Sequence, residues 1–215
     1  MGGPSQTLHI CATELRAEWR NRQVITTMVL LAGLTVVTFG FAGKAGSSHL
    51  APPALWVSLV LAAAAGIAQT ITRHEASSVT TALRLGGAGQ RSIFLGRLTA
   101  FYLLLSVTAG LCWALTALIF GGPTTAPARL AALLALGTLG LAAVGITIAS
   151  AISGAASGPA RLVPLLLLPL ALPVVLLGAK GTWGLTTTAA PEALGLMGLM
   201  DALLVGAGLW MTSKS

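Results

Sequence analysis

The sequence is poor in charged and aromatic residues. Only 8% of its 215 residues are charged and 5% are aromatic, whereas 55% are hydrophobic, and the mean hydropathy is +0.90. A soluble domain carries roughly 25% charged residues, so this chain has too few to cover a water-facing surface of its size. The composition excludes a soluble globular protein and predicts that lipid is the solvent for most of the chain.

Motifs that bind nucleotides or support hydrolysis are also missing. No GxxxxGK[ST], HExxH, GxSxG or GxGxxG string occurs. The histidines His9, His49 and His74 lie in separate segments without metal-ligand spacing. His49 could ligate haem iron, although a lone exposed histidine more often has no such role. We therefore expect a non-catalytic chain without a cofactor, metal or ATP site of its own.

What the sequence does contain is six long apolar runs. Each is near or above the roughly 20 residues that cross the hydrocarbon of a bilayer. The six predicted spans are Val24–Phe41, Pro53–Thr72, Ile93–Phe120, Leu130–Ser153, Leu162–Ala179 and Ala193–Met211. The runs leave no room for a second, soluble domain. We therefore predict one all-α integral membrane domain over residues 1–215.

The basic residues predict how the spans are oriented. Nine of them would lie on one side of the membrane: Arg16, Arg20, Arg22, Arg73, Arg84, Arg91, Arg97, Arg161 and Lys214. Three would lie on the other: Lys44, Arg129 and Lys180. The positive-inside rule makes the first side cytoplasmic and places both termini there. The net charge of +7 is thus a topology signal, and we expect no nucleic-acid partner.

Two segments outside the spans have helical character. In residues 6–23 an apolar stripe recurs at helical spacing, made of Leu8, Cys11, Ala12, Leu15 and Trp19. Glu14 lies off this stripe, and Glu18 can pair with Arg22. This pattern predicts an amphipathic helix in the cytoplasmic interface. The second segment, 73–92, is the largest cytoplasmic loop; it either carries a short helix that docks on a partner or is an ordinary basic loop.

Asp201 is the one acid placed inside a span. Such a carboxylate costs about 2.5–3.5 kcal/mol on insertion scales, so it is expected to face protein. Gly198, Ala202 and Gly206 recur beside it and predict a stripe that packs on another helix. Asp201 is then either a polar group in a transport pathway or an acid that fixes helix packing, and the stripe favours packing.

Three prolines mark the fifth span. Pro164, Pro169 and Pro173 each remove a backbone donor and bend a helix. Two interpretations stay open. The span is either a hinge or broken helix that lines a cavity, or a helix with a fixed kink that shapes the bundle.

Several stretches resemble one family of transporter subunits. They are the basic LRAEWRNR run of Leu15–Arg22, the second-span stretch Ala54–Ile67, and Leu139–Ala179, with its Gly-rich fourth span and LPLALP string. The chain resembles the haem exporter protein B family (CcmB), the permease subunit of the cytochrome c maturation ABC transporter. It departs from the family in the 73–92 loop, where Glu75 is the only acid and glycines stand in place of prolines.

The resemblance implies a fold and a function. The fold is an ABC-2-type permease of six helices with an N-terminal interfacial helix, in the bacterial inner membrane. Its partners would be an ABC ATPase subunit, as a dimer that binds ATP, the other membrane subunits of the maturation complex and, indirectly, a haem chaperone. Haem would be a substrate of the complex. The residues of ATPase contact are not taken from the resemblance. They are expected in the 73–92 loop because it is the long cytoplasmic segment that links two spans directly, and they should include Glu75, Val79, Leu83 and Arg84.

Two other functions remain open from the sequence. The chain could be the permease of another ABC-2-type exporter, for lipid, polysaccharide or drug, since the topology would be the same. It could also be a membrane scaffold that assembles haem-handling partners and has no transport path of its own.

Overall fold

The computed structural model describes residues 4–43, 48–76, 89–121, 126–153, 163–185 and 189–213. Its regular structure in these ranges is entirely helical, as predicted. The elements are α1 (Pro4–Asn21), α2 (Gln23–Ala42), the short 3-10 helix η1 (Ser48–Leu50), α3 (Ala51–Ala76), α5 (Gln90–Phe120), α6 (Pro127–Ser153), α7 (Val163–Trp183) and α8 (Ala189–Ser213).

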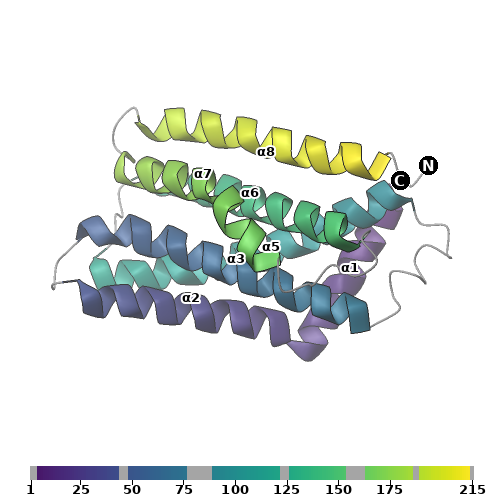
Figure 1. Cartoon of the computed structure of the whole chain (residues 1–215). Helices are drawn as coiled ribbons and strands as arrows, with labels where there is room; N and C mark the ends of the chain where they lie inside the picture. Colours follow the sequence, from purple (N-terminus) through teal and green to yellow (C-terminus); the bar gives the residue numbers. More distant parts are fainter. Residues whose placement is uncertain are drawn as a thin grey trace.

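Six of these helices are long and apolar enough to cross a membrane, which confirms the six predicted spans. They are α2, α3, α5, α6, α7 and α8, with mean hydropathies between 1.6 and 2.1. They lie side by side in one bundle (Figure 1). The fifth span runs on to Trp183 instead of ending at Ala179. The added turn stays in the bundle, because Gly181 packs against Leu133 and Ala193.

The remaining helix, α1, lies across one end of the bundle. Its axis is transverse to the six spans in Figure 1, and it packs mainly on α5. The start of α1 and the end of α8 lie at this same end of the bundle. We call it the α1 end. A transverse helix at the ends of the spans is the arrangement that an interfacial helix requires.

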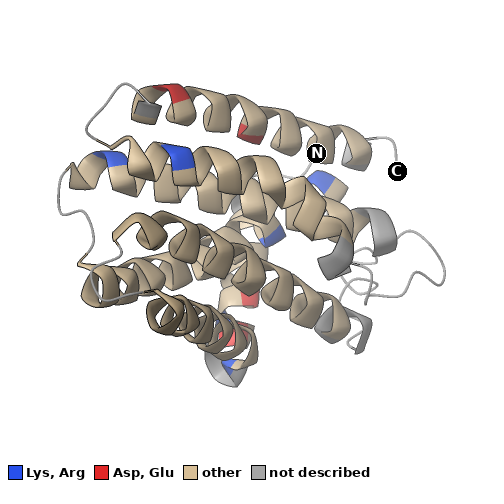
Figure 2. Cartoon of the chain, turned by 60° about the vertical axis from the view of Figure 1, so that its left-hand side comes forward, with Lys and Arg blue, Asp and Glu red and all other residues tan. Residues whose placement is uncertain are grey.

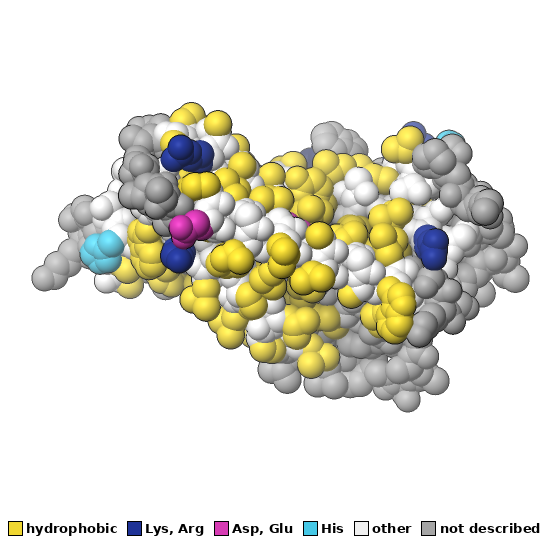
Figure 3. Space-filling view, turned by 90° about the horizontal axis from the view of Figure 1, so that it is seen from above, with side chains coloured by type: hydrophobic (Ala, Val, Ile, Leu, Met, Phe, Trp, Pro, Cys, Tyr) yellow, Lys and Arg dark blue, Asp and Glu magenta, His cyan; other side chains and the backbone are white. Residues whose placement is uncertain are grey.

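The outer surface of the bundle is apolar. Leu34 of α2, Leu118 of α5, Leu176 of α7 and Leu203 of α8 are all more than 60% exposed. Figure 3 shows hydrophobic side chains over the middle of one face, and Figure 2 shows that few of the described positions along the spans are charged. Such a surface would be unstable in water, so it is the lipid-facing surface.

Glycines bring the central helices close together. The backbone at Gly145 of α6 is in contact with Ile67 of α3 and Leu167 of α7, so that a side chain there would overlap Ile67. At Gly66 of α3 an added Cβ would lie 2.6 Å from Sδ of Met28 on α2. Helices in lipid gain little from hydrophobicity alone, and close packing of this kind supplies much of their association energy.

Candidate functional site

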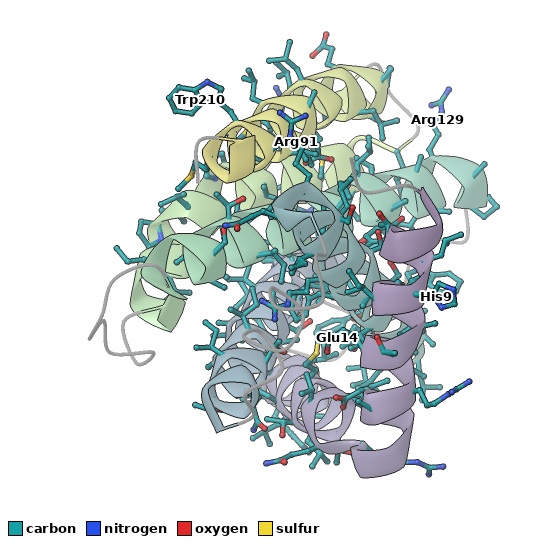
Figure 4. The ribbon with its side chains drawn as sticks, turned by 90° about the vertical axis from the view of Figure 1, so that its right-hand side faces the viewer. His9, Glu14, Arg91, Arg129 and Trp210 are labelled. Carbon is teal, nitrogen blue, oxygen red and sulfur yellow. The ribbon has the colours of Figure 1, made fainter. Side chains whose placement is uncertain are left out.

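The first group of functional residues lies where α1 crosses α5. Gly96 allows the crossing, because an added Cβ would come 2.7 Å from Cγ2 of Ile10 and 3.2 Å from the Thr7 carbonyl oxygen. Glu14 lies one turn after Ile10 on α1, and its Oε1 is 3.8 Å from Nε of Arg97, the residue that follows Gly96 on α5. In Figure 4 Glu14 points from α1 toward the bundle and His9 points away from it. The pair links the interfacial helix to the third span.

A second carboxylate links α1 to α2. Glu18 is only 2% exposed, and its Oε1 accepts a hydrogen bond of 3.0 Å from the backbone N–H of Ile25. That N–H belongs to the first turn of α2, whose N-terminus has no cap from the Arg22 side chain. A carboxylate at a helix N-terminus also complements the helix dipole. The pair of Glu14 and Arg97 is only partly exposed, and together with the bond from Glu18 it attaches α1 to both α5 and α2.

These charged groups border a small cavity of about 20 Å³. Its lining residues are Glu14, Glu18, Thr70, Arg97, Ala100, Phe101, Leu104 and Ile146, from α1, α3, α5 and α6. A cavity of this size holds about one water molecule. The cavity is therefore a small, partly polar contact region among four helices, and it is too small for haem.

The apolar stripe predicted for residues 6–23 lies only partly on the side of α1 that packs against the bundle, where Cys11 is buried. Leu8 is 69% exposed and Ala12 is also exposed, whereas Ile10 and Glu18 are buried. The face toward the bundle carries the carboxylates, because Arg97 of α5 supplies a countercharge that periodicity cannot reveal. A signal was present: Arg97 lies in the first turns of an apolar span, where a cation favours a nearby acidic partner. Burial, and then the nearby Glu14, raise the pKa of the Cys11 thiol on this face.

Of the predicted ATPase-contact residues, Glu75 belongs to a described helix, which ends at the α1 end of the bundle (Figure 1). It lies in the last turn of α3, and α5 begins at Gln90. Val79, Leu83 and Arg84 lie outside the described residues, so these contacts stay a prediction.

Asp201 is buried at the interface between α8 and α6. It is 4% exposed. A Cβ added at Gly140 would lie 2.5 Å from Oδ1 of Asp201. Oδ2 is buried without a hydrogen-bond partner. No described atom of this chain lies within 4 Å of a Cβ added at Gly198 or Gly206, so the predicted stripe does not pack on another described helix of the chain. Asp201 faces protein, as expected, about 100° around α8 from the middle of the stripe.

Thr147 repeats this pattern along the same two helices. Its Oγ1 is also buried without a hydrogen-bond partner. This oxygen faces Gly208 of α8 and would lie 2.9 Å from a Cβ added there. The distance between Gly140 and Thr147 is two helical turns, as is that between Asp201 and Gly208. We call this interface of α6 and α8, with Gly140 opposite Asp201 and Thr147 opposite Gly208, the α6–α8 seam.

In a neighbouring interface the buried polar side-chain groups are hydrogen-bonded. The indole ring of Trp56 on α3 is completely buried between Gly137 of α6 and Gly178 of α7. Its Nε1 donates a 2.9 Å hydrogen bond to Oγ1 of Thr182, which donates in turn to the Gly178 carbonyl at 2.7 Å. We call this contact the α3–α7 seam. Nothing in the sequence predicts this contact beyond a tryptophan near the start of a span.

The fifth span is bent and continuous. Helix α7 runs unbroken through Pro169 and Pro173, and both side chains are exposed on the outside of the bundle. In Figure 1 its green first part is inclined to the rest of the helix. The structure therefore has no broken helix at these two prolines. The side chain of Pro164 is not among those described, and movement at the prolines stays a prediction.

The end of the bundle opposite α1 is held by single hydrogen bonds. Arg129 Nη1 donates to the Leu185 carbonyl at 2.9 Å, and Trp183 Nε1 donates to the His49 carbonyl at 3.2 Å. The His49 side chain is exposed. Among the described residues, no three His, Cys, Asp or Glu side chains come together as a metal site. Haem ligation by His49 stays a prediction.

Comparison with known proteins assigns the family. Residues 5–211 match the family described as CcmB protein. Comparisons with curated proteins and with solved structures gave no match. The match covers nearly the whole chain, including α1 and all six spans. The chain belongs to the CcmB family and is a multi-pass membrane component of an ABC transporter of the haem-exporter type.

Proposed function

We propose that the chain is the permease subunit through which ATP hydrolysis, carried out by a separate subunit, drives haem delivery or release of the haem chaperone on the outer side of the membrane. The observation that carries this proposal is the family match over residues 5–211. The absence of a phosphate-binding loop from the sequence supports an ATPase on another chain.

The α1 end of the bundle is then the cytoplasmic end. The excess of basic residues predicted on this side supports the assignment, with the bacterial inner membrane as the location. A dimer of ATPase subunits would approach from here. The other membrane subunits of the maturation complex would meet the apolar flanks of the bundle, within the lipid bilayer.

The contacts at the α1 end supply a physical route for coupling. Glu14 links α1 to α5 through Arg97, and Glu18 links α1 to the start of α2. The segment 73–92 joins α3 directly to α5. A force applied to α1 or to this segment would therefore reach three spans together, as packed helices move between discrete arrangements. ATPase contacts are expected to include Glu75, Val79, Leu83 and Arg84.

A paired substitution tests this route. Replacing Val79 and Leu83 together with Asp would place two charges on one face of the expected helix. We expect the ATPase subunit to be lost when the complex is purified by a tag on this chain. The control replaces Ser77 and Thr81 with Asp, which adds the same charges on the opposite face. Normal ATPase retention and activity in the Val79/Leu83 variant would remove this segment from the mechanism.

ATP dependence separates a permease from a scaffold. The assay uses the purified complex in lipid nanodiscs and measures haem-loaded chaperone released on addition of ATP. Release that stops when the ATPase subunit carries an inactivating substitution supports coupling. Co-purification of all partners with release independent of ATP would instead show that the chain is a scaffold.

A further inference from the structure

The Asp201 carboxyl group lies in an apolar seam with no polar partner. It is 4% exposed, its Oδ1 is directed at the Gly140 backbone, and its Oδ2 has no hydrogen-bond partner. The next-nearest side chain to the same glycine is that of Val174 on α7, at 3.4 Å from an added Cβ. Gly140 leaves just enough room for the carboxyl group, so the site is shaped around it.

No countercharge faces this group from the helices that pack on α8. Those helices are α6, α7 and α5. Their described basic side chains are those of Arg91 and Lys180, which are exposed, Arg97, which lies beside Glu14, and Arg129, which donates to the Leu185 carbonyl. Helix α5 also carries Tyr102 and Cys112, and neither supplies a positive charge. On α8 itself Glu192 is exposed and lies about 14 Å along the axis. An ionised Asp201 would therefore be an unpaired charge inside the bilayer.

Asp201 also belongs to the span of which the smallest share is buried in the bundle. Only 17% of the α8 span is buried, compared with 72% of the span that contains α3. Thr147 adds a second buried oxygen without a partner. Among the described residues, no hydrogen bond or ion pair is found between the side chains of α6 and α8. Packing of side chains therefore holds these two helices together, and a charge on the carboxyl group would disfavour that packing.

We propose that Asp201 is an intramembrane proton-binding site. Its carboxyl group is neutral while α6 and α8 are packed together, and it exchanges its proton with water when the seam separates. The ligand is a proton, bound at a carboxylate oxygen. This site is independent of the ATPase contacts proposed above, because it lies in the membrane-embedded part of α8.

Infrared spectroscopy of the full-length chain in lipid nanodiscs tests the protonation state. The difference spectrum between wild type and Asp201→Asn should contain the C=O band of a protonated carboxylic acid at neutral pH. The band should shift on transfer to deuterated water, since the proton exchanges. A carboxylate band in its place would overturn the proposal, and a protonated band that never exchanges would overturn the proton-exchange part.

Carbodiimide labelling tests access to the same group. A protonated carboxyl group adds across a carbodiimide C=N bond, and the adduct rearranges to an N-acylurea that retains the whole reagent. Dicyclohexylcarbodiimide, which partitions into lipid, should label Asp201, with labelling lost as the pH rises; a charged water-soluble carbodiimide should label Glu192 instead. Asp201→Asn and Glu192→Gln are the matched controls. Labelling of Glu192 by the water-soluble reagent with none of Asp201 by the lipid-soluble one would contradict the proposal.

Discussion

Two glycines of α6 that are one turn apart accommodate very different side chains in the α3–α7 and α6–α8 seams. Gly137 of α6 receives the Trp56 ring, whose indole N–H is bonded to Thr182. Gly140, one turn further along, receives the carboxyl group of Asp201, which has no partner. A hydrogen-bonded aromatic ring makes the first seam rigid, whereas an unpaired acid makes the second one dependent on its protonation. The bundle thus contains one fixed interface and one that can switch.

The largest effect is expected from removing the ring that fixes the α3–α7 seam. Trp56→Ala should lower the free energy of unfolding in mixed micelles by about 3–5 kcal/mol, because it leaves a cavity between three helices. Trp113, on the outside of α5, is 36% exposed, and Trp113→Ala serves as the control with a much smaller loss. Equal losses in the two variants would show that Trp56 has no special role.

A cation at the α6–α8 seam should be the next most harmful change. On insertion scales a lysine costs about as much as the aspartate it replaces, roughly 2.5–3.5 kcal/mol. The harm of Asp201→Lys is therefore expected from a longer, cationic side chain in the tight space beside Gly140. The measurement is the fraction of inserted, folded protein in isolated membranes. Glu192→Lys makes the same chemical change at an exposed position and should have little effect. Normal insertion of Asp201→Lys would mean that the seam is already open to water.

A smaller effect is expected from removing only the hydrogen bond of the α3–α7 seam. Thr182→Val keeps the shape of the side chain but leaves the buried indole N–H of Trp56 unpaired, which should cost about 1–3 kcal/mol. Thr99→Val is the control, because Thr99 is exposed and bonds only to Leu95 of its own helix. Unfolding in denaturant titrations should separate the two variants; identical midpoints would contradict this account of the seam.

The smallest effect on stability is expected at Asp201 itself. Asp201→Asn keeps the size of the neutral acid and should change the free energy of unfolding by less than about 0.5 kcal/mol. Cytochrome c maturation measured in the same variant then separates the effect of losing the ionisable group from any effect on stability. Loss of maturation with normal insertion and assembly would show that ionisation is needed, whereas a large loss of stability would show that the wild-type group is charged.

The sequence predicted the fold better than the contacts within it. Apolar runs long enough for a bilayer depend on composition alone, so the six spans and the N-terminal helix were readable. The orientation of α1 was not, since its buried face depends on Arg97, far away in the chain. Likewise, the stripe of Gly198 and Gly206 gave the wrong face of α8, because small residues suit both lipid and packing. The Trp56–Thr182 bond joins distant helices and has no local signature.

Spin-label distances at the two seams test the central claim most directly. The native cysteines Cys11 and Cys112 are first replaced by Ala. One pair of labels, at Ala135 and Leu203, then measures the distance between α6 and α8, and a second pair, at Thr72 and Leu166, measures that between α3 and α7. All four labelled positions are exposed. In nanodiscs, raising the pH should ionise Asp201 and lengthen or broaden the first distance, leaving the second unchanged. Asp201→Asn should abolish the change. A first distance that is constant over the whole pH range, or equal changes at both pairs, would contradict the account.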